Sequence, residues 1–394
     1  MAKGLEDTAL YCYNPLTSLN DVGSKPISIG APADYFHNGN LVRQVDWPYT
    51  MNTTSTHDTK RSEDVRARIN VLSEMPAAWN DRFIRWSRLN NPRKKIVEGN
   101  IVPDAGMEMF IYQALIGAWP LFQDELSGFK ERLKSYVIKA ARESKIYTSW
   151  LSLNRPYEDA LISFVEEILG DQDQNSFLQD FLELHRYVAY YGALNSLSQV
   201  LLKVTSPGIP DIYQGTEIWD FSLVDPDNRR PVRYDVMAKM LGELKRRETR
   251  ELHELIKELL NTWEDGRIKL YTTYRALNAR RAYQGLFVRG DYIPLQAKGK
   301  NELNICAFLR RKDDQWALAV TPRLLTGLVS SSQFPIGEDI WGDDCLILPN
   351  DAPHNWHNIF TGEQIQLTSK TGCLPIAQAL YIFPVALLIC QPDK

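Results

Sequence analysis

The sequence has little of the features that would assign a protein class at once. Its cysteines are few and odd in number, at positions 12, 306, 345, 373 and 390, and no two stand in a C-x-x-C spacing. They therefore predict neither a disulfide framework nor a structural zinc site, and they favour a reducing, cytoplasmic location. The histidines show no metal-like spacing, so we expect no metal and no other cofactor.

Long apolar runs and an excess of one charge sign are also absent. The last apolar run, 377–390, is shorter than the roughly 18 residues that a membrane span needs, and it contains Pro384. The first residues, M-A-K-G-L-E-D, lack the apolar core of a secretory signal. Lys and Arg number 45 against 49 Asp and Glu, a net charge of -4. We therefore expect neither a membrane nor a nucleic acid as partner.

What the chain does have is length and aromatic side chains. Its 394 residues suggest two or three domains. The 10 Trp and 18 Tyr would suit a carbohydrate site, because aromatic rings stack on the apolar faces of sugars. The alternative is that they fill the core and interfaces.

The N-terminal part places one polar pair on a loop. Residues 1–55 have little periodicity and several Gly and Pro, so they predict loop with short elements. Ser62, followed by two acidic residues, predicts the start of a helix, since a hydroxyl cap and acids in the first turn suit the positive end of the helix dipole. His57 and Asp58 then fall on the loop just before that helix.

The middle of the chain is expected to be mostly helical, over 76–205. An apolar stripe over 157–169 is followed by Gly170, and a second helix over 177–204 has Ser176 as a plausible cap. The segment 209–213 predicts a short strand, and 235–263 predicts helix.

Beyond about residue 280 the pattern changes to short strands separated by turn residues. These are expected over 305–309, 316–320, 345–348, 359–367 and 380–389. They predict a small antiparallel β domain, most simply a sandwich. The segment 271–288 could belong to either side of the boundary.

Three clusters could carry chemistry. His57 and Asp58, followed by Lys60 and Arg61, form a dense polar group where functional side chains are often found. The alternative is a capping Asp with a solvated basic face. The segment P-G-I-P-D-I-Y-Q-G-T-E at 207–217 would place Gln214 at the open end of a barrel strand, or it is simply a turn.

The third cluster is D-P-D-N-R-R-P at 225–231. Its Asp225, Asp227, Arg229 and Arg230 could bind sugar hydroxyls or brace one another. Bracing is the simpler interpretation from the residues alone.

Three stretches together resemble one known family. They are M-A-K-G-L-E-D-T-A-L-Y, then W-P-Y-T-M-N-T-T-S-T-H-D-T-K-R-S-E-D-V-R-A-R, and then P-G-I-P-D-I-Y-Q-G-T-E-I-W-D-F-S-L-V-D-P-D-N-R-R-P. The sequence resembles the maltooligosyl trehalose synthases, members of the α-amylase superfamily with a (β/α)8 barrel. The third stretch is partly shared with amylases generally, and the β-rich end carries no sharp motif.

The resemblance implies a rearranging transglycosylase acting on maltooligosaccharides. The family converts the reducing-end α-1,4 linkage to an α,α-1,1 linkage by intramolecular transfer, leaving a terminal trehalose unit. On the family pattern Asp58 is the carboxylate that stabilises the transition state, with His57 beside it, and Lys60 and Arg61 line the site. Further candidate contacts to substrate are Gln214, Asp225, Asp227 and Arg229.

The resemblance also implies an α/β plus β architecture in four segments. Residues 1–75 would be part of the barrel, in the region of strands six and seven, and 76–205 a helical insertion. Residues 206–280 would supply the last barrel strand and helix, and 281–394 the C-terminal β domain. The chain would thus be the incomplete C-terminal part of the barrel enzyme.

The sequence departs from the family in one large respect. Retaining glycosyl transfer needs a nucleophile and an acid/base carboxyl about 5 Å apart, and in this family both lie upstream of M-A-K-G. We therefore expect this chain to be inactive alone. Three origins of the short sequence stay open: a split gene whose other half is a separate chain, a frameshift, and a wrongly called start. Cys12, where the family usually has Arg, is a smaller departure. The alternatives are a non-catalytic glucan-binding or structural half of a split enzyme, and a fragment of an amylase-type hydrolase.

Overall fold

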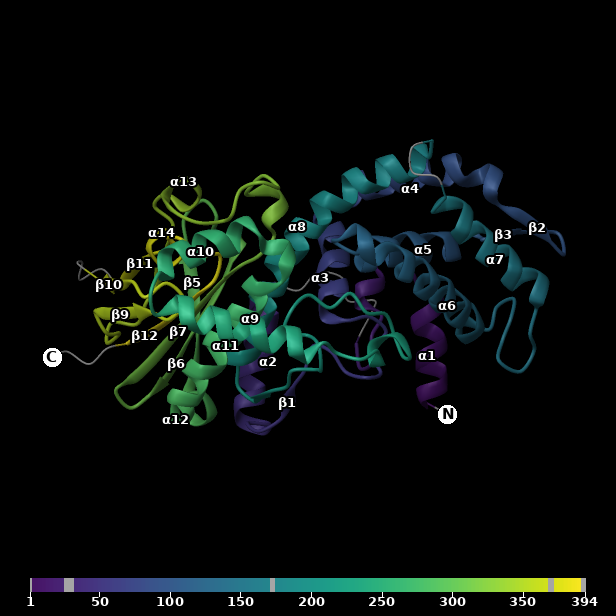
Figure 1. The fold of residues 1–394 in the computed structure, drawn as a ribbon. Coiled ribbons are helices and arrows are strands. Elements are labelled where there is room, and N and C mark those ends of the chain that lie inside the picture. The colour runs from purple at the N-terminus through teal and green to yellow at the C-terminus, as the bar shows by residue number, and fades with distance from the viewer. Residues whose placement is uncertain (1, 25–31, 171–173, 368–371, 391–394) are drawn as a thin grey trace. The chain divides into compact units, whose positions relative to one another are not determined.

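The computed structural model describes residues 2–24, 32–170, 174–367 and 372–390 (Figure 1). The chain divides into two compact units. The first unit comprises Met1–Ile29, Ser55–Gly192 and Asp220–Pro231, and the second comprises Gly30–Thr54, Ala193–Trp219 and Val232–Lys394. Each unit is therefore assembled from segments far apart in the sequence.

The first unit is helical. Its helices are α1 (Ala2–Cys12), α3 (Glu63–Val71), α4 (Pro76–Asn90), α5 (Ala105–Ala118), α6 (Leu126–Ser144), α7 (Arg155–Ile168) and the first part of α8 (Ser176–Thr205), with a small hairpin of β2 (Lys95–Val97) and β3 (Asn100–Val102). Contacts join α1 to α6, α3 to α5, and α6 to α7. No helix in the described ranges has both the length and the apolar character needed to span a bilayer.

Aromatic side chains fill the centre of this unit. The fully buried Trp86 meets Tyr112 and Phe177 edge-on, with ring centroids 5.4 Å apart in each case. Its indole N–H donates to the carboxylate of Asp180. The aromatic side chains of this stretch therefore serve the core, with the buried polar atom of the tryptophan satisfied.

The prediction that residues 1–55 are mostly loop is wrong. The structure has α1 and also α2 (Ala33–Asp46) in this stretch, while 25–31 lie outside the described residues. In α2 the buried side chains are polar, His37 and Asn40, and both contact the Tyr292 hydroxyl, at 2.7 and 3.2 Å. A helix that docks through polar groups leaves no apolar period in the sequence.

The predicted helix starts are confirmed with one correction. The Ser62 side chain accepts a hydrogen bond from the main-chain N–H of Val65, so it caps α3 as expected. At the start of α8, however, the cap is Asn175, whose side-chain oxygen accepts from the N–H of Leu178 at 3.2 Å. Ser176 is already the first residue of that helix.

The second unit combines helices with strands. It holds α2, the end of α8, α9 (Tyr234–Glu248), α10 (Leu252–Asn261), α11 (Arg267–Ala282), α12 (Gln284–Arg289), α13 (Glu338–Trp341) and α14 (Ile376–Ala379). Two short strands, β1 (Met51–Asn52) and β4 (Ile209–Pro210), pair in parallel. The strand predicted at 209–213 is therefore confirmed only for its first two residues.

The remaining strands form one curled antiparallel sheet (Figure 1). They are β5 (Asp291–Lys298), β6 (Ile305–Lys312), β7 (Gln315–Pro322), β8 (Cys345–Ile347), β9 (Asn355–Asn358), β10 (Gln364–Gln366), β11 (Cys373–Pro375) and β12 (Ala386–Cys390), in the order β10-β9-β12-β7-β6-β5-β8-β11. Strand β5 pairs with β6 through 291–295 and with β8 through 296–298. The strands from β5 to β12 are thus hydrogen-bonded into one sheet, whereas the predicted sandwich would have two sheets.

Both faces of this sheet are buried. Along β12, Leu387 and Ile389 belong to the core shared with helices α9 to α12, whereas Leu388 belongs to the core on the other face. Successive side chains of a strand point to opposite faces. A strand covered on both sides therefore gives a continuous apolar run, which is why the sequence pattern located β6, β7 and β12.

The strand predictions and the cysteine prediction need correction. Strands β5, β9 and β11 were missed, and the segment 359–367 holds only β10, preceded by a turn at Gly362 with φ of +75°. Cys345 and Cys373 form a disulfide that joins the antiparallel strands β8 and β11. The sequence could not show this disulfide, because the two cysteines come together on one face only through the pairing of β8 with β11.

Candidate functional site

The loop that carries His57 and Asp58 is fixed by its own hydroxyl groups. The Thr56 hydroxyl accepts hydrogen bonds from the main-chain N–H groups of Asp58 (3.2 Å) and Thr59 (3.1 Å). The Thr59 hydroxyl donates in turn to the Thr56 carbonyl at 2.9 Å. Such local bonds from Thr stabilise turns, so the two candidate side chains are presented from a defined backbone. His57 is exposed and Asp58 is half-buried.

Lys60 links the loop to the first helix of the chain. Its ammonium contacts Asp58 Oδ1 at 3.3 Å and Asp7 Oδ1 at 2.8 Å. The Lys60 side chain is only 4% exposed, against 29% for Asp58 and 22% for Asp7. One buried cation therefore holds two carboxylates that still reach solvent. Asp7 was not singled out from the sequence, although it lies within the first family motif.

Arg61 does not line an open site in this structure. Its side chain is fully buried, donates to the Thr17 carbonyl at 3.1 Å, and lies 5.2 Å from the centre of the Phe110 ring. Its main chain forms an isolated antiparallel bridge with Leu223. Arg61 thus anchors the strand-like end of the loop in the protein interior.

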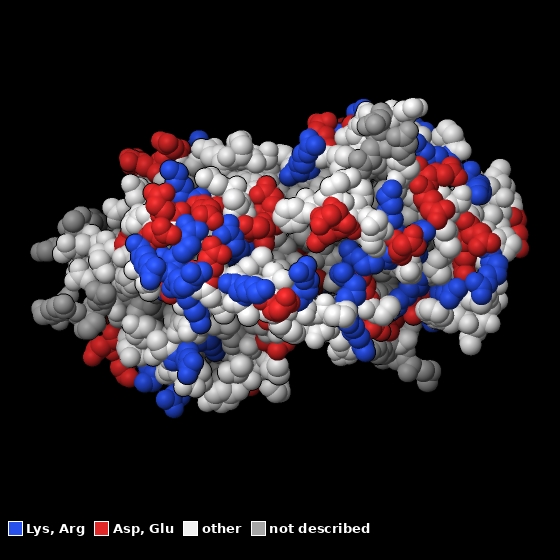
Figure 2. All heavy atoms as spheres, in the orientation of Figure 1, with Lys and Arg blue, Asp and Glu red and all other residues white. Residues whose placement is uncertain are grey.

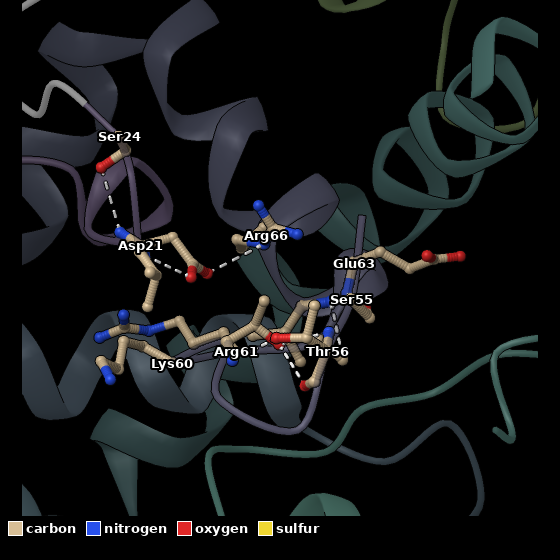
Figure 3. Close-up of polar contacts among 12 residues, drawn as sticks. Asp21, Ser24, Ser55, Thr56, Lys60, Arg61, Glu63 and Arg66 are labelled. Atoms are coloured by element: carbon tan, nitrogen blue, oxygen red, sulfur yellow. Dashed lines mark hydrogen bonds and ion pairs between the residues drawn. The ribbon is translucent and has the colours of Figure 1, made fainter. Parts of the chain in front are cut away.

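Neighbouring contacts hold the start of α3 in place. The Ser55 hydroxyl accepts from the Glu63 N–H at 2.8 Å. Figure 3 shows the side chains of Asp21 and Arg66 pointing toward one another, and Asp21 Oδ2 lies 3.6 Å from Arg66 Nε. Burial raises the pKa of the Asp21 carboxyl above its ordinary value, and the positive charge of Arg66 opposes that shift.

The charged side chains of the 225–231 segment are paired with partners. Asp227 Oδ2 accepts from the Leu223 N–H at 2.8 Å and from Arg132 Nη1 at 2.7 Å, and Arg230 lies 2.9 Å from Asp227 Oδ1. Arg229 Nε contacts Asp225 Oδ1 at 2.7 Å. Bracing within this segment is therefore what the structure shows, while Asp225 and Arg229 remain partly exposed.

Asn228 connects this segment to the loop of His57. Its amide nitrogen donates to the His57 carbonyl at 3.0 Å and to the Thr56 carbonyl at 3.3 Å. Nearby, Asp64 Oδ2 accepts from the Asp220 N–H at 2.8 Å. The structure thus brings 56–64 and 220–230 together. The sequence offered no signal for Asn228, because its acceptors are main-chain atoms more than 170 residues away.

One cationic side chain of α6 also reaches this region. The Lys139 ammonium donates to the main-chain carbonyl of Asp225. Burial lowers the pKa of the Lys139 amine, and the carboxylate of Asp225 opposes the shift. Lys139 was not singled out from the sequence.

Gln214 belongs to the second unit, whereas the other candidate residues belong to the first unit. It is exposed in a turn in which both the N–H and the hydroxyl of Thr216 donate to the Tyr213 carbonyl, at 3.0 and 2.7 Å. Gly215 follows with φ of +89°, a conformation that favours glycine. The segment around Gln214 therefore forms a turn, whose exposed side chain is that of Gln214.

Across the described residues, no three His, Cys, Asp or Glu side chains gather in a way that could hold a metal ion. The chemistry available in the first unit is that of carboxylates, ammonium and guanidinium groups, and an exposed imidazole. Such groups donate and accept the hydrogen bonds that sugar hydroxyls offer, and a carboxylate stabilises a positive charge developing on a sugar ring.

Comparisons with known proteins give consistent results. No family model matches the sequence. A curated relative from Mycobacterium tuberculosis, named as a maltooligosyl trehalose synthase, is 34% identical over 388 residues, covering 98% of this chain and 44% of the relative. The solved maltooligosyltrehalose synthase from Arthrobacter ramosus has a TM-score of 0.78 and 34% identity, with 99% of this chain and 45% of that chain covered. A further solved maltooligosyl trehalose synthase has a TM-score of 0.73 and 33% identity. The resemblance inferred from the motifs is thereby confirmed, and the chain spans less than half the length of these relatives.

Proposed function

We propose that this chain, a homologue of part of the maltooligosyl trehalose synthases, carries one portion of that enzyme's active site. The proposed reaction is the family's intramolecular transfer, in which the reducing-end α-1,4 linkage of a maltooligosaccharide becomes α,α-1,1. The observation that supports it is the fixed loop of His57 and Asp58, which bears the most specific family motif, in a chain that matches these enzymes over 98% of its length.

Asp58 is proposed as the carboxylate that stabilises the transition state. Glycosyl transfer passes through an oxocarbenium-like state whose positive charge a nearby carboxylate favours. A carboxylate contributes most when it needs no rearrangement at the moment of reaction. The hydrogen bond that the Thr56 hydroxyl accepts from the Asp58 N–H, together with the contact between Asp58 and Lys60, supplies that preorganisation. His57, exposed beside it, would donate a hydrogen bond to a sugar hydroxyl.

The other candidates take direct or supporting roles according to their exposure. Asp225, Arg229 and Gln214 reach solvent, and we propose them as contacts to sugar hydroxyls. Arg61 is buried and the Asp227 side chain is only 10% exposed, so we propose that they position the loop and the 225–231 segment. Lys60 is proposed to orient the Asp58 carboxylate at the edge of the substrate site.

We further propose that the two remaining carboxylates come from segments that these 394 residues do not supply. In this proposal 1–75 and 206–280 complete a barrel with those segments, 76–205 is the helical insertion, and 281–394 is the C-terminal β domain. The parallel pairing of β1 with β4 is the arrangement that neighbouring barrel strands have.

The test is an assay of maltopentaose with the purified chain, with and without a second chain that carries the other barrel segments. The expected result is loss of reducing ends and formation of a non-reducing, trehalose-ended product only when both chains are present. Release of new reducing ends would indicate a hydrolase instead. Robust isomerisation by this chain alone would contradict the proposed division of the carboxylates.

A further inference from the structure

A pocket lies in the first unit beside, but outside, the loop of His57 and Asp58. Its volume is about 800 Å³, and its walls come from α6, from the segment between α6 and α7, from α7, and from residues 224–230. The lining residues that matter here are Tyr136, Lys139, Arg142, Trp150, Asp225 and Arg230. This volume is in the range of ligand-binding pockets in proteins.

The cationic side chains of the pocket are already paired with acceptors. Arg142 makes a two-pronged contact with Glu158, at 2.9 Å from Nε and 2.7 Å from Nη2. Arg132 and Arg230 both contact Asp227, at 2.7 and 2.9 Å. An anionic ligand would have to compete with these carboxylates for the same donors. The charges therefore favour a neutral ligand that exchanges hydrogen bonds with paired groups. Figure 2 shows the same interspersion of acidic and basic side chains on the visible surface.

Trp150 gives the pocket an apolar wall of fixed orientation. The residue is 53% exposed, its indole N–H donates to Glu143 Oε1 at 2.8 Å, and the Arg142 guanidinium lies 4.8 Å from the ring centre. The neighbouring Leu151 is fully exposed. An exposed indole ring that is held by a hydrogen bond and a cation offers a flat surface for an apolar ligand face.

Tyr136 contributes a buried side chain to the pocket wall. It is 4% exposed, and its hydroxyl is inaccessible to solvent. Tyr136 therefore shapes the pocket, and the hydrogen bonds to a ligand would come from the charged groups around it.

From these observations we propose that the pocket binds a neutral oligosaccharide, with one sugar ring against Trp150. Polyhydroxylated rings combine an apolar face with many hydroxyls, which is the chemistry of this wall. The choice of an α-1,4-glucan as the sugar rests on the proposed function. Residues 224–230 form one wall of the pocket, and Asn228 of the same segment bonds to the loop of His57. The pocket would therefore hold the part of the oligosaccharide that extends beyond the reacting linkage.

The experiment is isothermal titration of the purified chain with maltoheptaose, with inorganic phosphate as the anionic probe. We expect saturable binding of maltoheptaose, at least about tenfold weakening by Trp150→Ala, and partial recovery by Trp150→Phe. Tyr136→Phe should change the affinity little, because the hydroxyl that it removes is inaccessible to the ligand. Trp47→Ala, at an exposed tryptophan in the second unit, is the matched control and should leave the affinity unchanged.

Failure here is distinguishable from failure of the proposed function, because binding is measured without turnover. Asp58→Asn should abolish isomerisation by the assembled enzyme yet leave maltoheptaose binding intact. Absence of maltoheptaose binding, equal affinity in Trp150→Ala, or saturable phosphate binding that excludes the sugar would each overturn the proposal. Tighter binding of unrelated oligosaccharides such as cellohexaose would support an oligosaccharide site but contradict the assignment of an α-1,4-glucan as its ligand.

Discussion

The side-chain amide of Asn228 donates to the main-chain carbonyl of His57 at 3.0 Å, across 171 positions of sequence. The contact ties the segment of paired charges at 225–231 to the loop of the candidate carboxylate. It does so through the backbone, so it fixes where His57 and Asp58 sit without occupying either side chain. Asn228 is therefore a positioning residue for the proposed site.

Replacing Asn228 should loosen that loop. In Asn228→Ala one hydrogen bond to each of two carbonyls is lost, and a single such bond contributes about 1 kcal/mol. We expect amide exchange at residues 56–59 to accelerate about 5- to 30-fold, the range for the loss of one to two such bonds, measured by hydrogen–deuterium exchange on the purified chain. Asn278→Ala, on an exposed helical surface, is the control. Unchanged exchange at 56–59 would show that the contact does not restrain the loop.

In an enzyme assembled from both portions, Asp58→Ala should reduce turnover by about two decades. Interactions with the sugar ring that strengthen in the transition state supply several kcal/mol, and roughly 3 kcal/mol corresponds to a factor of about a hundred in rate. His57→Ala should cost less, since a neutral donor stabilises developing positive charge less than a carboxylate does. The measurement is kcat on maltopentaose for both variants. Near-normal turnover in Asp58→Ala would contradict the catalytic role of Asp58 and leave it only a structural role in the turn.

Local sequence rules predicted the parts of the fold that depend on neighbours in the chain. The cap at Ser62 and the loop position of His57 and Asp58 follow from residue types over a few positions. The apolar runs at 305–309 and 316–320 identified β6 and β7, because both faces of these strands are buried.

What sequence could not predict depends on long-range packing. Strand β5 was missed, and it contains Pro294, a residue that the interior of a sheet disfavours, yet β5 pairs with both β6 and β8. Arg61 reads as a solvated charge, but aromatic rings that arrive from α5 and α6 enclose it. The hydrogen bonds from Asn228 to the loop of His57 also depend on long-range packing. Their acceptors are main-chain atoms, whose positions no residue pattern encodes.

The pairing of Arg142 with Glu158 should make stability depend on pH. Hydrogen bonds from Arg142 hold the pKa of the buried Glu158 carboxyl below its ordinary value. The stabilisation is therefore present above the unfolded-state pKa of about 4.3 and is lost as the pH falls through the lower folded-state pKa. We expect Glu158→Gln to lower the free energy of unfolding at pH 7 by roughly 1–3 kcal/mol, with a smaller difference at pH 3. Urea titrations at the two pH values measure this, and an equal deficit at both would contradict it.

The disulfide between Cys345 and Cys373 should stabilise the edge of the sheet that ends in β11. It closes a loop with a sequence separation of 28, for which the chain-entropy model gives about 3–4 kcal/mol. Cys373→Ser should therefore lower the melting temperature, whereas Cys12→Ser, at an exposed free thiol, should not. Treatment of the unsubstituted chain with a reductant should reproduce the Cys373→Ser melt. A melt that is indifferent to reductant would show that the bond contributes nothing to stability.

An apolar surface in the second unit should govern how the purified chain behaves. Val45, Trp47, Tyr49 and Met51, at the end of α2 and in β1, are each at least 64% exposed. Beside them, the two-stranded sheet of β1 and β4 has open edges, which are templates for further pairing. Exposed apolar patches drive association. We therefore expect the chain alone to bind a hydrophobic dye and to self-associate in size-exclusion chromatography with light scattering.

Trp47→Lys together with Val45→Lys should reduce both signals, because two charges would then stand on that surface. Exposed positions tolerate such changes, so the thermal melt should stay within a few degrees of the unsubstituted chain. The matched control is Leu151→Lys, which adds a charge at an exposed apolar residue of the first unit. A second chain with the other barrel segments could cover this surface. Adding that chain should then lower dye binding by the unsubstituted protein, and it should fail to assemble with the doubly substituted protein. A dye-silent, monodisperse monomer of the unsubstituted chain would show that this surface needs no cover, and would favour a non-catalytic glucan-binding role over the two-chain enzyme.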